Sequence, residues 1–403
     1  MRVLCLSLAV LLVSCGNSSV TGPVDHAEGG GPPPAGGAGP SIPPVASLTD
    51  GVWMKGDLHI HSRHSLDSTN NPVAKIVSLA ETVGMDYLLI SDHDNHVDGD
   101  VAGNTWSDPE FRSDSVLLLY GAEWTTHRGH GTALSARPYD HRRFYQVRDQ
   151  RDVTIGAVKQ ALGIHLSANH PGASDHFGFS YDLVDSIEVW NSAIWSTNAT
   201  SLLIWDDMLK SGRRIAARGG SDSHHGYPDT PGQEAAPNNV QAPANNVGTP
   251  TTWVFGTDRS SDAVVAALGN GRTSVSANPY APRVEFLADL DRDGRMDLMM
   301  GDNARATGGP VNFRVQLLGG TVPLVPYTVK VTKDGAELGS FRSAGAVPTV
   351  EFTDTPASDA RSYYRVEVTG SATAYPEVPF STLLSGNMVG LSSPIYFNFD
   401  PDL

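Results

Sequence analysis

The stretch Gly56–His96 constrains the fold of this 403-residue chain more than any other part of the sequence. It begins inside a predicted strand, Trp53–Ile60, whose end carries two histidines one residue apart, His59 and His61. Side chains two residues apart lie on the same face of a strand. Both imidazoles can therefore reach a single metal ion from one strand end.

The rest of the stretch repeats this arrangement at a second strand. Asp67 follows in a polar loop, Val73–Val83 has the apolar spacing of a helix, and the apolar segment Tyr87–Ile90 leads directly to Asp92 and His93. The order strand, helix, strand predicts a βαβ unit with metal-binding residue types at both strand ends. Active sites of parallel α/β proteins lie at this edge of the sheet. We therefore expect an α/β fold with a metal site.

Further candidate ligands follow the strands predicted downstream. Glu123 lies near the end of an apolar strand, where a carboxylate is costly unless a charge compensates it. His130 lies on a glycine-flanked turn, His170 follows another strand, and Asp222 and His224 follow a later one. Chance rarely places ligand types at so many successive strand ends, so these residues indicate one metal centre.

Taken together, the His-x-His pair, the Ser-x-Asp-Ser loop, the Ser-Asp-His-Asp-Asn segment and the Asp-x-His pair resemble the motifs of the PHP (polymerase and histidinol phosphatase) superfamily of metal-dependent hydrolases. The later segments look more like its carbaryl-hydrolase (CehA/McbA-type) branch. The resemblance implies a distorted seven-stranded, TIM-like β/α barrel as the metallohydrolase domain, within residues 47–280.

The resemblance also implies a set of ligands for two or three divalent ions. The first ion would be held by His59, His61, Glu123 and Asp222, the second by Glu123, His130 and His170, and the third by Asp67, His93 and His224. The catalytic residues would be Glu123, Asp222 and His224. Many relatives place the loop acid one residue earlier, where Leu66 stands here, which leaves the geometry of the third position open.

The chemistry expected of such a centre is hydrolysis of an ester bond. Two divalent ions about 3.5–4 Å apart lower the pKa of a shared water and so supply a bridging hydroxide as nucleophile. Zinc, manganese and iron all accept histidine and carboxylate ligands. Phosphate esters are the favoured substrates. A carbamate or carboxylic ester is the alternative, with Trp124, Trp190 or Trp195 lining an apolar pocket, and a non-catalytic, metal-containing binding lipoprotein is the alternative of another class.

Several other polar residues have plainer interpretations. Asp92 is expected to orient a ligating imidazole or to cap a loop, and Glu188 to line the pocket or to make structural hydrogen bonds. Arg63, Arg128 and Arg218 could each bind a phosphate, but a surface ion pair is the favoured interpretation. The remaining histidines are expected to be exposed or hydrogen-bonded: His26, His64, His96, His127, His141, His165, His176 and His225.

The N-terminus has the pattern of an export signal. Residues 1–14 end in Leu-Val-Ser before Cys15, which is similar to a bacterial lipobox. We expect lipid at Cys15 to anchor the chain to a membrane, in the periplasm or at the cell surface, with residues 15–46 as a flexible tether. Ordinary signal cleavage nearby is the alternative. Because the remaining cysteine, Cys5, is also in this segment, the folded part has neither disulfides nor thiolate metal sites.

Charge and histidine content divide function along the chain. The net charge of −16 argues against nucleic acid as a partner, because no basic stripe neutralises phosphates, and a small-molecule ester is expected instead. Thirteen of the 14 histidines lie between His59 and His225. We therefore assign the chemistry to residues 47–280.

Residues 281–403 are predicted to form an all-β, sandwich-like domain of short strands. One segment in it resembles a calcium loop of the EF-hand type, in which oxygens at alternate positions wrap one ion. Met300 stands where the closing glutamate is usual, so a solvated turn is slightly favoured over a calcium site. The candidate calcium ligands are Asp289, Asp291, Asp293 and Asp297.

Overall fold

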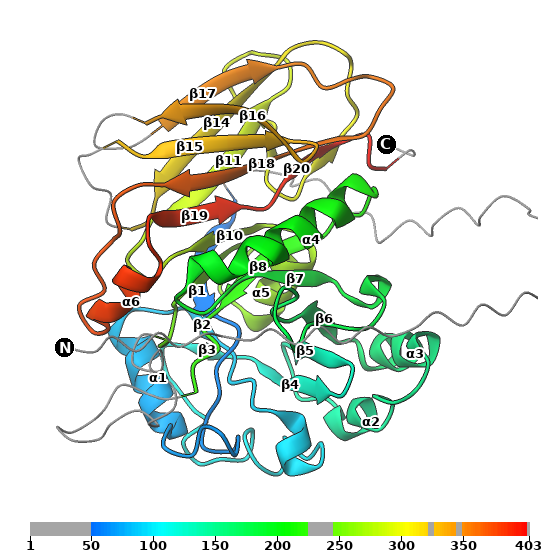
Figure 1. The fold of residues 1–403 in the computed structure, drawn as a ribbon, viewed down its shortest axis with the longest axis vertical. Coiled ribbons are helices and arrows are strands. Elements are labelled where there is room, and N and C mark those ends of the chain that lie inside the picture. The colour runs from blue at the N-terminus through cyan, green and yellow to red at the C-terminus, as the bar shows by residue number, and fades with distance from the viewer. Residues whose placement is uncertain (1–49, 225–244, 321–325, 344–348, 401–403) are drawn as a thin grey trace, which may run out of the picture. The chain divides into compact units, whose positions relative to one another are not determined.

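The computed structural model describes residues 50–224, 245–320, 326–343 and 349–400, which belong to one compact unit, Gly39–Leu403. This part of the chain is a mixed α/β structure with many strands and few helices, which confirms the predicted class (Figure 1). The predicted signal peptide, Cys15 and the tether lie outside the described residues. Among the residues that are described, no helix is both long and apolar enough to cross a bilayer.

The largest sheet has eleven strands and combines segments from both ends of the described chain. Its strands are β1 (Val52–Asp57), β2 (Tyr87–Leu88), β3 (Leu117–Leu118), β9 (Thr251–Gly256), β10 (Thr273–Ser276), β13 (Asn303–Ala304), β15 (Thr328–Lys333), β16 (Ala336–Arg342), β18 (Ser362–Thr369), β19 (Met388–Ser392) and β20 (Ile395–Phe397). β1, β2 and β3 are parallel neighbours, and β9 and β10 continue the sheet in antiparallel fashion beyond β1. β10 then pairs with β19, with Val275 opposite Leu391, so the sheet is continuous across residue 280.

Five further strands form the sheet beside the candidate site. They are β4 (Tyr120–Thr126), β5 (Gly129–Ser135), β6 (His165–Ala168), β7 (Ser186–Asn191) and β8 (Ala216–Gly220). Single parallel bridges join His93 to Glu123 and Ile60 to Ser223, so the two edges of this sheet lie against the chain just beyond β2 and β1. Because β2 and β3 are only two residues long and β3 does not pair with β4, the described strands form separate sheets, and one closed seven-stranded barrel is not seen among them.

Helices and 3-10 segments connect these strands. They are α1 (Val73–Thr82), α2 (His141–Tyr145), α3 (Asp152–Leu162), α4 (Ala199–Lys210), α5 (Ser261–Gly269) and the 3-10 segments η1 (Asp94–Val97), η2 (Tyr181–Leu183) and η3 (Trp195–Asn198). α1 confirms the helix predicted from Val73 and buries it together with Ile76, Val77 and Ala80, the spacing of an amphipathic helix. This face packs against Ile60 and Leu88, and so supports the strand ends that carry the candidate ligands.

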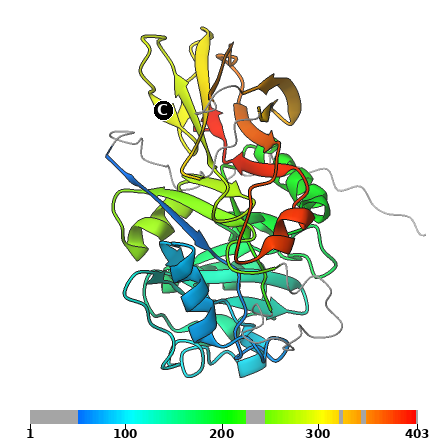
Figure 2. The ribbon, with the colours of Figure 1, turned by 90° about the vertical axis from the view of Figure 1, so that its left-hand side faces the viewer.

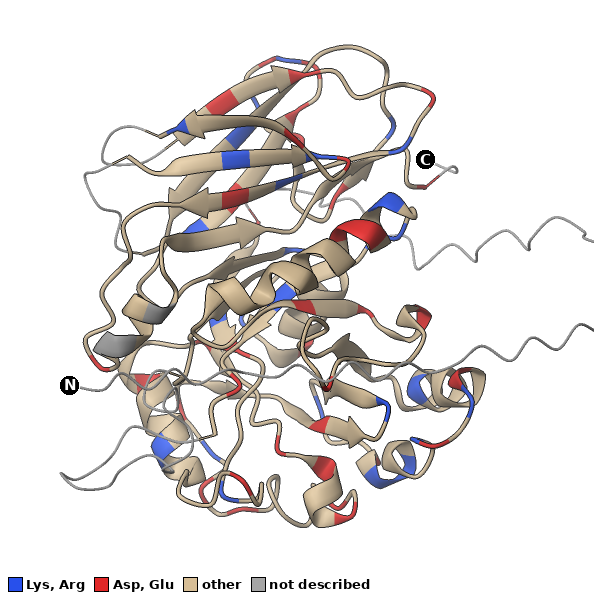
Figure 3. Cartoon of the chain, viewed as in Figure 1, with Lys and Arg blue, Asp and Glu red and all other residues tan. Residues whose placement is uncertain are grey.

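The C-terminal strands form two β layers (Figures 1 and 2). A four-stranded sheet of β11 (Arg283–Asp289), β12 (Leu298–Met299), β14 (Val311–Leu318) and β17 (Thr349–Asp354) shares an apolar core with β15, β18 and β20 of the large sheet. Aromatic rings of both layers meet there, among them Phe286, Phe313, Tyr364 and Phe397. The short helix α6 (Pro379–Leu384) also lies in this part of the chain, which is therefore not entirely β. Acidic and basic residues are interspersed over the described chain, both before and after residue 280 (Figure 3).

Candidate metal centre

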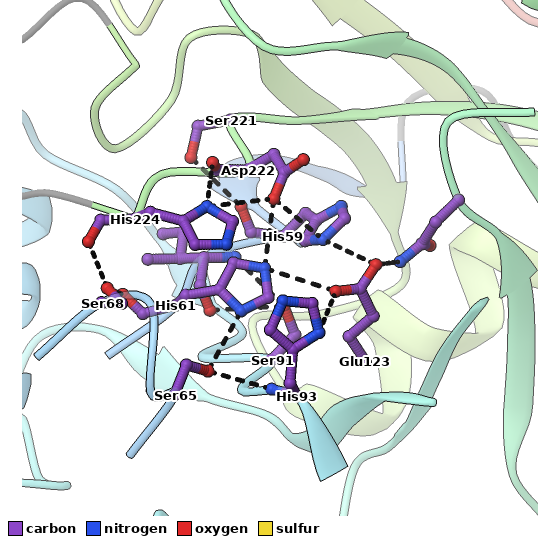
Figure 4. A network of polar contacts seen from close by, with 12 residues as sticks. His59, His61, Ser65, Ser68, Ser91, His93, Glu123, Ser221, Asp222 and His224 are labelled. Atoms are coloured by element: carbon purple, nitrogen blue, oxygen red, sulfur yellow. Dashed lines mark hydrogen bonds and ion pairs between the residues drawn. The ribbon is translucent and has the colours of Figure 1, made fainter. Parts of the chain in front are cut away.

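The end of β1 places His59 and His61 in the interior of the protein (Figure 4). The backbone here is held by Asp57, whose buried carboxylate accepts hydrogen bonds from the N–H groups of His59 (3.1 Å), Ser221 (3.1 Å) and Gly248 (2.7 Å). Burial raises the pKa of Asp57 to about 6, although these hydrogen bonds oppose the shift. Asp57 thereby fixes the strand end against the segments that follow β8 and precede β9.

Glu123 of β4 is the point on which the imidazoles converge (Figure 4). Its buried carboxylate lies between 2.9 and 3.5 Å from ring nitrogens of five histidines: His59, His61, His93, His130 and His170. Burial alone would raise the pKa of the Glu123 carboxyl, but the imidazoles, His59 and His93 above all, hold it well below its usual range. Glu123 therefore stays ionised, as a bridging ligand must.

The loop after β8 adds Asp222 and His224. Asp222 Oδ1 lies 3.1 Å from His61 Nε2, 3.4 Å from His59 Nε2 and 3.5 Å from His224 Nδ1. The backbone of Asp222 is in the left-handed region (φ 51°), as is that of His170 (φ 26°). Such conformations in residues other than glycine cost about 1–3 kcal/mol and gather at functional sites. The chain thus accepts backbone strain at two candidate ligands.

The loop after β1 contributes Asp67 to a third group. Asp67 Oδ2 lies 3.3 Å from His93 Nε2 and 3.4 Å from His224 Nε2. The His61 ring stacks on those of His93 and His224, with centroids 4.3 and 4.1 Å apart. Leu66 is 72% exposed, whereas the Asp67 carboxylate lies beside His93 and His224, so Asp67, and not the position before it, faces the imidazoles. All nine predicted ligand residues therefore lie together, and ligation itself stays a prediction.

One buried nitrogen shows that the cluster fits a metal ion. His59 Nε2 is buried without a hydrogen-bond partner among the described residues, although its other ring nitrogen lies 3.0 Å from Glu188. Carboxylate oxygens of Glu123 and Asp222 lie 3.3 and 3.4 Å from this nitrogen, so one cation could join the three groups. An unsatisfied buried polar atom costs about 1–3 kcal/mol, which ligation would remove. The groups whose geometry could hold an ion include His59–His61–Asp222, His59–Glu123–His170, His93–Glu123–His130 and His61–His93–His224.

A fully buried arginine, Arg218, lies beside this cluster. The expectation that it forms a surface ion pair is wrong, because the register of β7 and β8 places it opposite Glu188 in the interior. Its guanidinium donates hydrogen bonds to Glu188 (2.7 Å), Ser167 (2.6 Å), Thr132 (3.1 Å) and Asn169. A buried charge is tolerated only when it is paired and hydrogen-bonded, and this set of partners meets both conditions.

Glu188 transmits this support to the candidate ligands. Its Oε1 lies 3.0 Å from His59 Nδ1, and its Oε2 accepts a hydrogen bond from the backbone N–H of His170 (2.8 Å). Burial alone would raise the pKa of Glu188, but Arg218 and then His59 lower it to about 2. An ionised Glu188 keeps the proton on His59 Nδ1 and leaves Nε2 available to a metal. Similarly, Asn169 donates to Glu123 Oε1 (2.8 Å).

Replacing Glu188 by glutamine is expected to weaken metal binding about 10–100-fold, the usual effect of losing the partner of a ligating histidine. The amide cannot accept bonds from His59, His170 and Arg218 as the carboxylate does. Isothermal titration of the metal-free protein with zinc measures the change. Glu351→Gln is the matched control, because Glu351 also pairs with an arginine, Arg314 (2.7 Å), but in the C-terminal sheet. Equal zinc affinity in both variants would contradict the role of Glu188.

Asp92 lies beside His61, and a serine stands between the two side chains. Its buried carboxylate accepts hydrogen bonds from the hydroxyls of Ser62 (2.7 Å), Ser65 (2.9 Å) and Thr105 (2.7 Å). Ser65 Oγ in turn lies 3.3 Å from His61 Nδ1. Asp92 therefore orients His61 through a serine, because the loop after β1 inserts Ser65 between the two side chains.

The other polar residues mostly follow their plainer interpretations. Arg63 and Arg128 form ion pairs with Asp108 (2.8 Å) and Asp152 (2.7 Å). His26 and His225 lie outside the described residues. Several remaining histidines have polar partners: His64 with Asp108, His127 with Asp149, His141 with Asp94 and His165 with Ser186.

The four aspartates of the candidate calcium loop lie in the turn between β11 and β12. Asp289 is buried and accepts hydrogen bonds from the N–H groups of Arg292 (2.7 Å) and Gly294 (3.0 Å). Asp297 accepts one from Leu290, Asp291 one from Asp293, and Asp293 pairs with Arg295. These carboxylates are thus engaged by the turn itself, and calcium binding stays a prediction.

Comparisons with known proteins add little to this description. No known family model and no curated protein matches the chain. Among solved structures, an engineered protein is similar over 80% of this chain and 79% of its own, at 13% identity and a TM-score of 0.18. A TM-score this low indicates neither fold nor function.

Proposed function

We propose that the protein is a metal-dependent hydrolase of the PHP type and that its active site is the cluster around Glu123. The observation that carries the proposal is the convergence of the nine predicted ligand residues, with the buried Nε2 of His59 available for ligation. The strands around the site would correspond to the distorted barrel of that superfamily, with the two isolated bridges marking the places where its parts meet.

The reaction that we assign to this site is hydrolysis of a phosphate ester. Zinc, manganese or iron bound at the cluster would supply a water of lowered pKa and positive charge beside the substrate. The residues of the chain would provide orientation: Glu188 holds His59, and Asn169 holds Glu123. Asp67 has a side chain that is 48% exposed, so this side of the cluster is open to a substrate.

Hydrolysis of a carbamate or carboxylic ester is the second candidate reaction. It needs an apolar pocket, but Trp124 and Trp190 are fully buried in the protein core and do not line an open one. Only Trp195 of the three expected tryptophans is part-buried, which favours the phosphate ester. A non-catalytic binding lipoprotein stays the alternative of another class. Export and a lipid anchor at Cys15 belong to the same proposal and are supported by the N-terminal sequence alone.

The test uses purified protein that lacks residues 1–46, since the described fold begins at residue 50. Bound metals are measured by elemental analysis, and the same sample is assayed with p-nitrophenyl phosphate, bis-p-nitrophenyl phosphate and a naphthyl carbamate. We expect more than one ion per chain, with phosphate ester turnover that chelation stops and added zinc or manganese restores. Carbamate turnover alone would favour the second reaction. Protein that takes up no metal and stays inert would contradict the hydrolase.

A further inference from the structure

Asp175, in the loop after β6, lies beside two candidate ligands but belongs to none of the predicted metal groups. Its Oδ1 lies 3.2 Å from His170 Nδ1, and its Oδ2 lies 3.8 Å from His130 Nδ1. Ligand atoms of these three residues all lie within 4.8 Å of one another, a spacing that could hold a metal ion. The side chain of Asp175 is 52% exposed, so this group forms the solvent-facing edge of the cluster.

The contact between Asp175 and His170 differs from an ordinary hydrogen bond. The two atoms are 3.2 Å apart, yet His170 Nδ1 is buried without a hydrogen-bond partner among the described residues. A hydrogen bond needs the N–H to point at the acceptor, and a short distance without that alignment does not satisfy the nitrogen. Two ligands of one ion can have this relation, because each points at the ion and not at the other. His170 would then ligate through Nδ1, while its Nε2 stays hydrogen-bonded to Glu123 Oε1 (3.2 Å).

Two carboxylates, those of Glu123 and Asp175, approach one nitrogen of His130. Glu123 Oε1 and Asp175 Oδ2 approach the same nitrogen, His130 Nδ1, at 3.2 and 3.8 Å. One ring nitrogen offers either one proton or one lone pair, so it cannot serve two carboxylates. Carboxylates that share a site repel each other unless a positive charge lies near both. A metal ion beside His130 would be ligated by its imidazole and would neutralise the charges of both carboxylates.

We propose that Asp175 is an additional metal ligand, which together with His130 and His170 closes the solvent-facing side of the second metal position. This inference rests on the metal centre of the proposed function and adds a residue to it. The ion would be a divalent cation that accepts imidazole and carboxylate ligands, such as zinc, manganese or iron. Because Asp175 is half-exposed while Glu123 is buried, Asp175 is the ligand that can yield its place to an incoming substrate oxygen.

Cobalt(II) binding to a cysteine variant tests direct ligation. A coordinating thiol is deprotonated by the metal, and a cobalt–thiolate bond gives a charge-transfer band in the near ultraviolet. Protein lacking residues 1–46 contains no cysteine of its own, so Asp175→Cys introduces the only thiol. We expect the band in Asp175→Cys and not in the control Asp149→Cys. Asp149 is also half-exposed (56%) and lies 3.1 Å from a histidine, His127, but belongs to no predicted metal group.

Asparagine at the same position separates ligation from orientation of His170. Its amide oxygen still accepts a hydrogen bond from His170, but it is a poor ligand for a divalent ion. Ligation therefore predicts that Asp175→Asn and Asp175→Ala both weaken cobalt binding at least about tenfold, as measured by titration. An asparagine variant with the affinity of the parent, together with no band in Asp175→Cys, would overturn the proposal and leave the hydrolase intact. A band in protein that hydrolyses no ester would uphold the metal site and remove the proposed function, and protein that binds no cobalt would overturn both.

Discussion

Replacing Glu123 by glutamine is expected to reduce phosphate ester hydrolysis about 10³-fold or more and to lower the amount of bound metal. The Glu123 carboxylate lies no more than 3.5 Å from five imidazoles. Glutamine keeps the size of the side chain but removes its charge. Its amide NH2 is a donor, so it can neither accept a hydrogen bond from the imidazole nitrogens nor ligate a metal ion beside them. Loss of a single stabilising group at an active site typically costs about 10²–10³ in rate, and loss of an ion adds to this.

The measurement combines turnover of p-nitrophenyl phosphate with elemental analysis of Glu123→Gln. Circular dichroism verifies that the variant is folded. Glu81→Gln is the matched control, because Glu81 lies near the end of α1 and binds only a surface hydroxyl, that of Ser113 (2.6 Å), so the parental rate is expected. If Glu123→Gln keeps both its metals and the parental rate, Glu123 is not part of the centre. If the parent protein also shows no turnover, the result would favour the non-catalytic binding lipoprotein.

The sequence was informative wherever a residue type and a local pattern coincided. The α/β class and helix α1 follow from apolar spacing, which reports burial of one face of an element. The candidate ligands could be foreseen to lie together, because most of them follow a strand and the ends of neighbouring strands meet at one edge of a sheet. Their pairwise distances could not be foreseen, since these depend on how the loops carrying Asp67 and Asp222 fold.

Contacts between residues that are distant in the sequence could not be predicted from such patterns. Arg218 looked like a surface residue, because only the β7–β8 register shows that Glu188 lies opposite it. Asp175 lies in a polar loop without periodicity, and its position between two histidines depends on the fold of β5 and β6. The pairing of β10 with β19 likewise joins segments more than a hundred residues apart. Periodicity indicates which face is buried but not what it is buried against.

The ion pair between α4 and β18 is such a long-range contact, and its loss is expected to have the largest effect on stability. Asp206 and Arg365 are both nearly fully buried. Arg365 donates two hydrogen bonds to Asp206 (2.8 and 2.5 Å), and Tyr363 donates a third (3.0 Å). Burial alone would lower the pKa of Arg365, but Asp206 raises it above its ordinary value. The guanidinium therefore stays charged and depends on its partner.

Asp206→Ala is expected to lower the free energy of unfolding by about 3–5 kcal/mol, because it leaves the buried Arg365 charge with Glu367 as its remaining ion-pair partner among the described residues. Urea denaturation of the metal-free protein measures the loss. The neighbouring Asp207 is the control: its side chain is 76% exposed and pairs only with Lys210 on the same helix, so Asp207→Ala should change stability by less than about 0.5 kcal/mol. Equal stability of the two variants would contradict the assignment.

A double variant distinguishes the stability lost with the ion pair itself from the cost of leaving one buried charge unpaired. In Asp206→Leu with Arg365→Met, neither charge of the pair remains, and Glu367 keeps Lys330 as its ion-pair partner (2.8 Å). A buried ion pair can often be replaced by apolar residues with little loss. We therefore expect the double variant to be more stable than Asp206→Ala. Because α4 packs with Trp205 and Leu209 in the same core as β7 and Tyr363, loosening this contact also reaches the strand that carries Glu188. Weaker zinc binding in Asp206→Ala, restored in the double variant, would show that the C-terminal strands support the metal centre through α4.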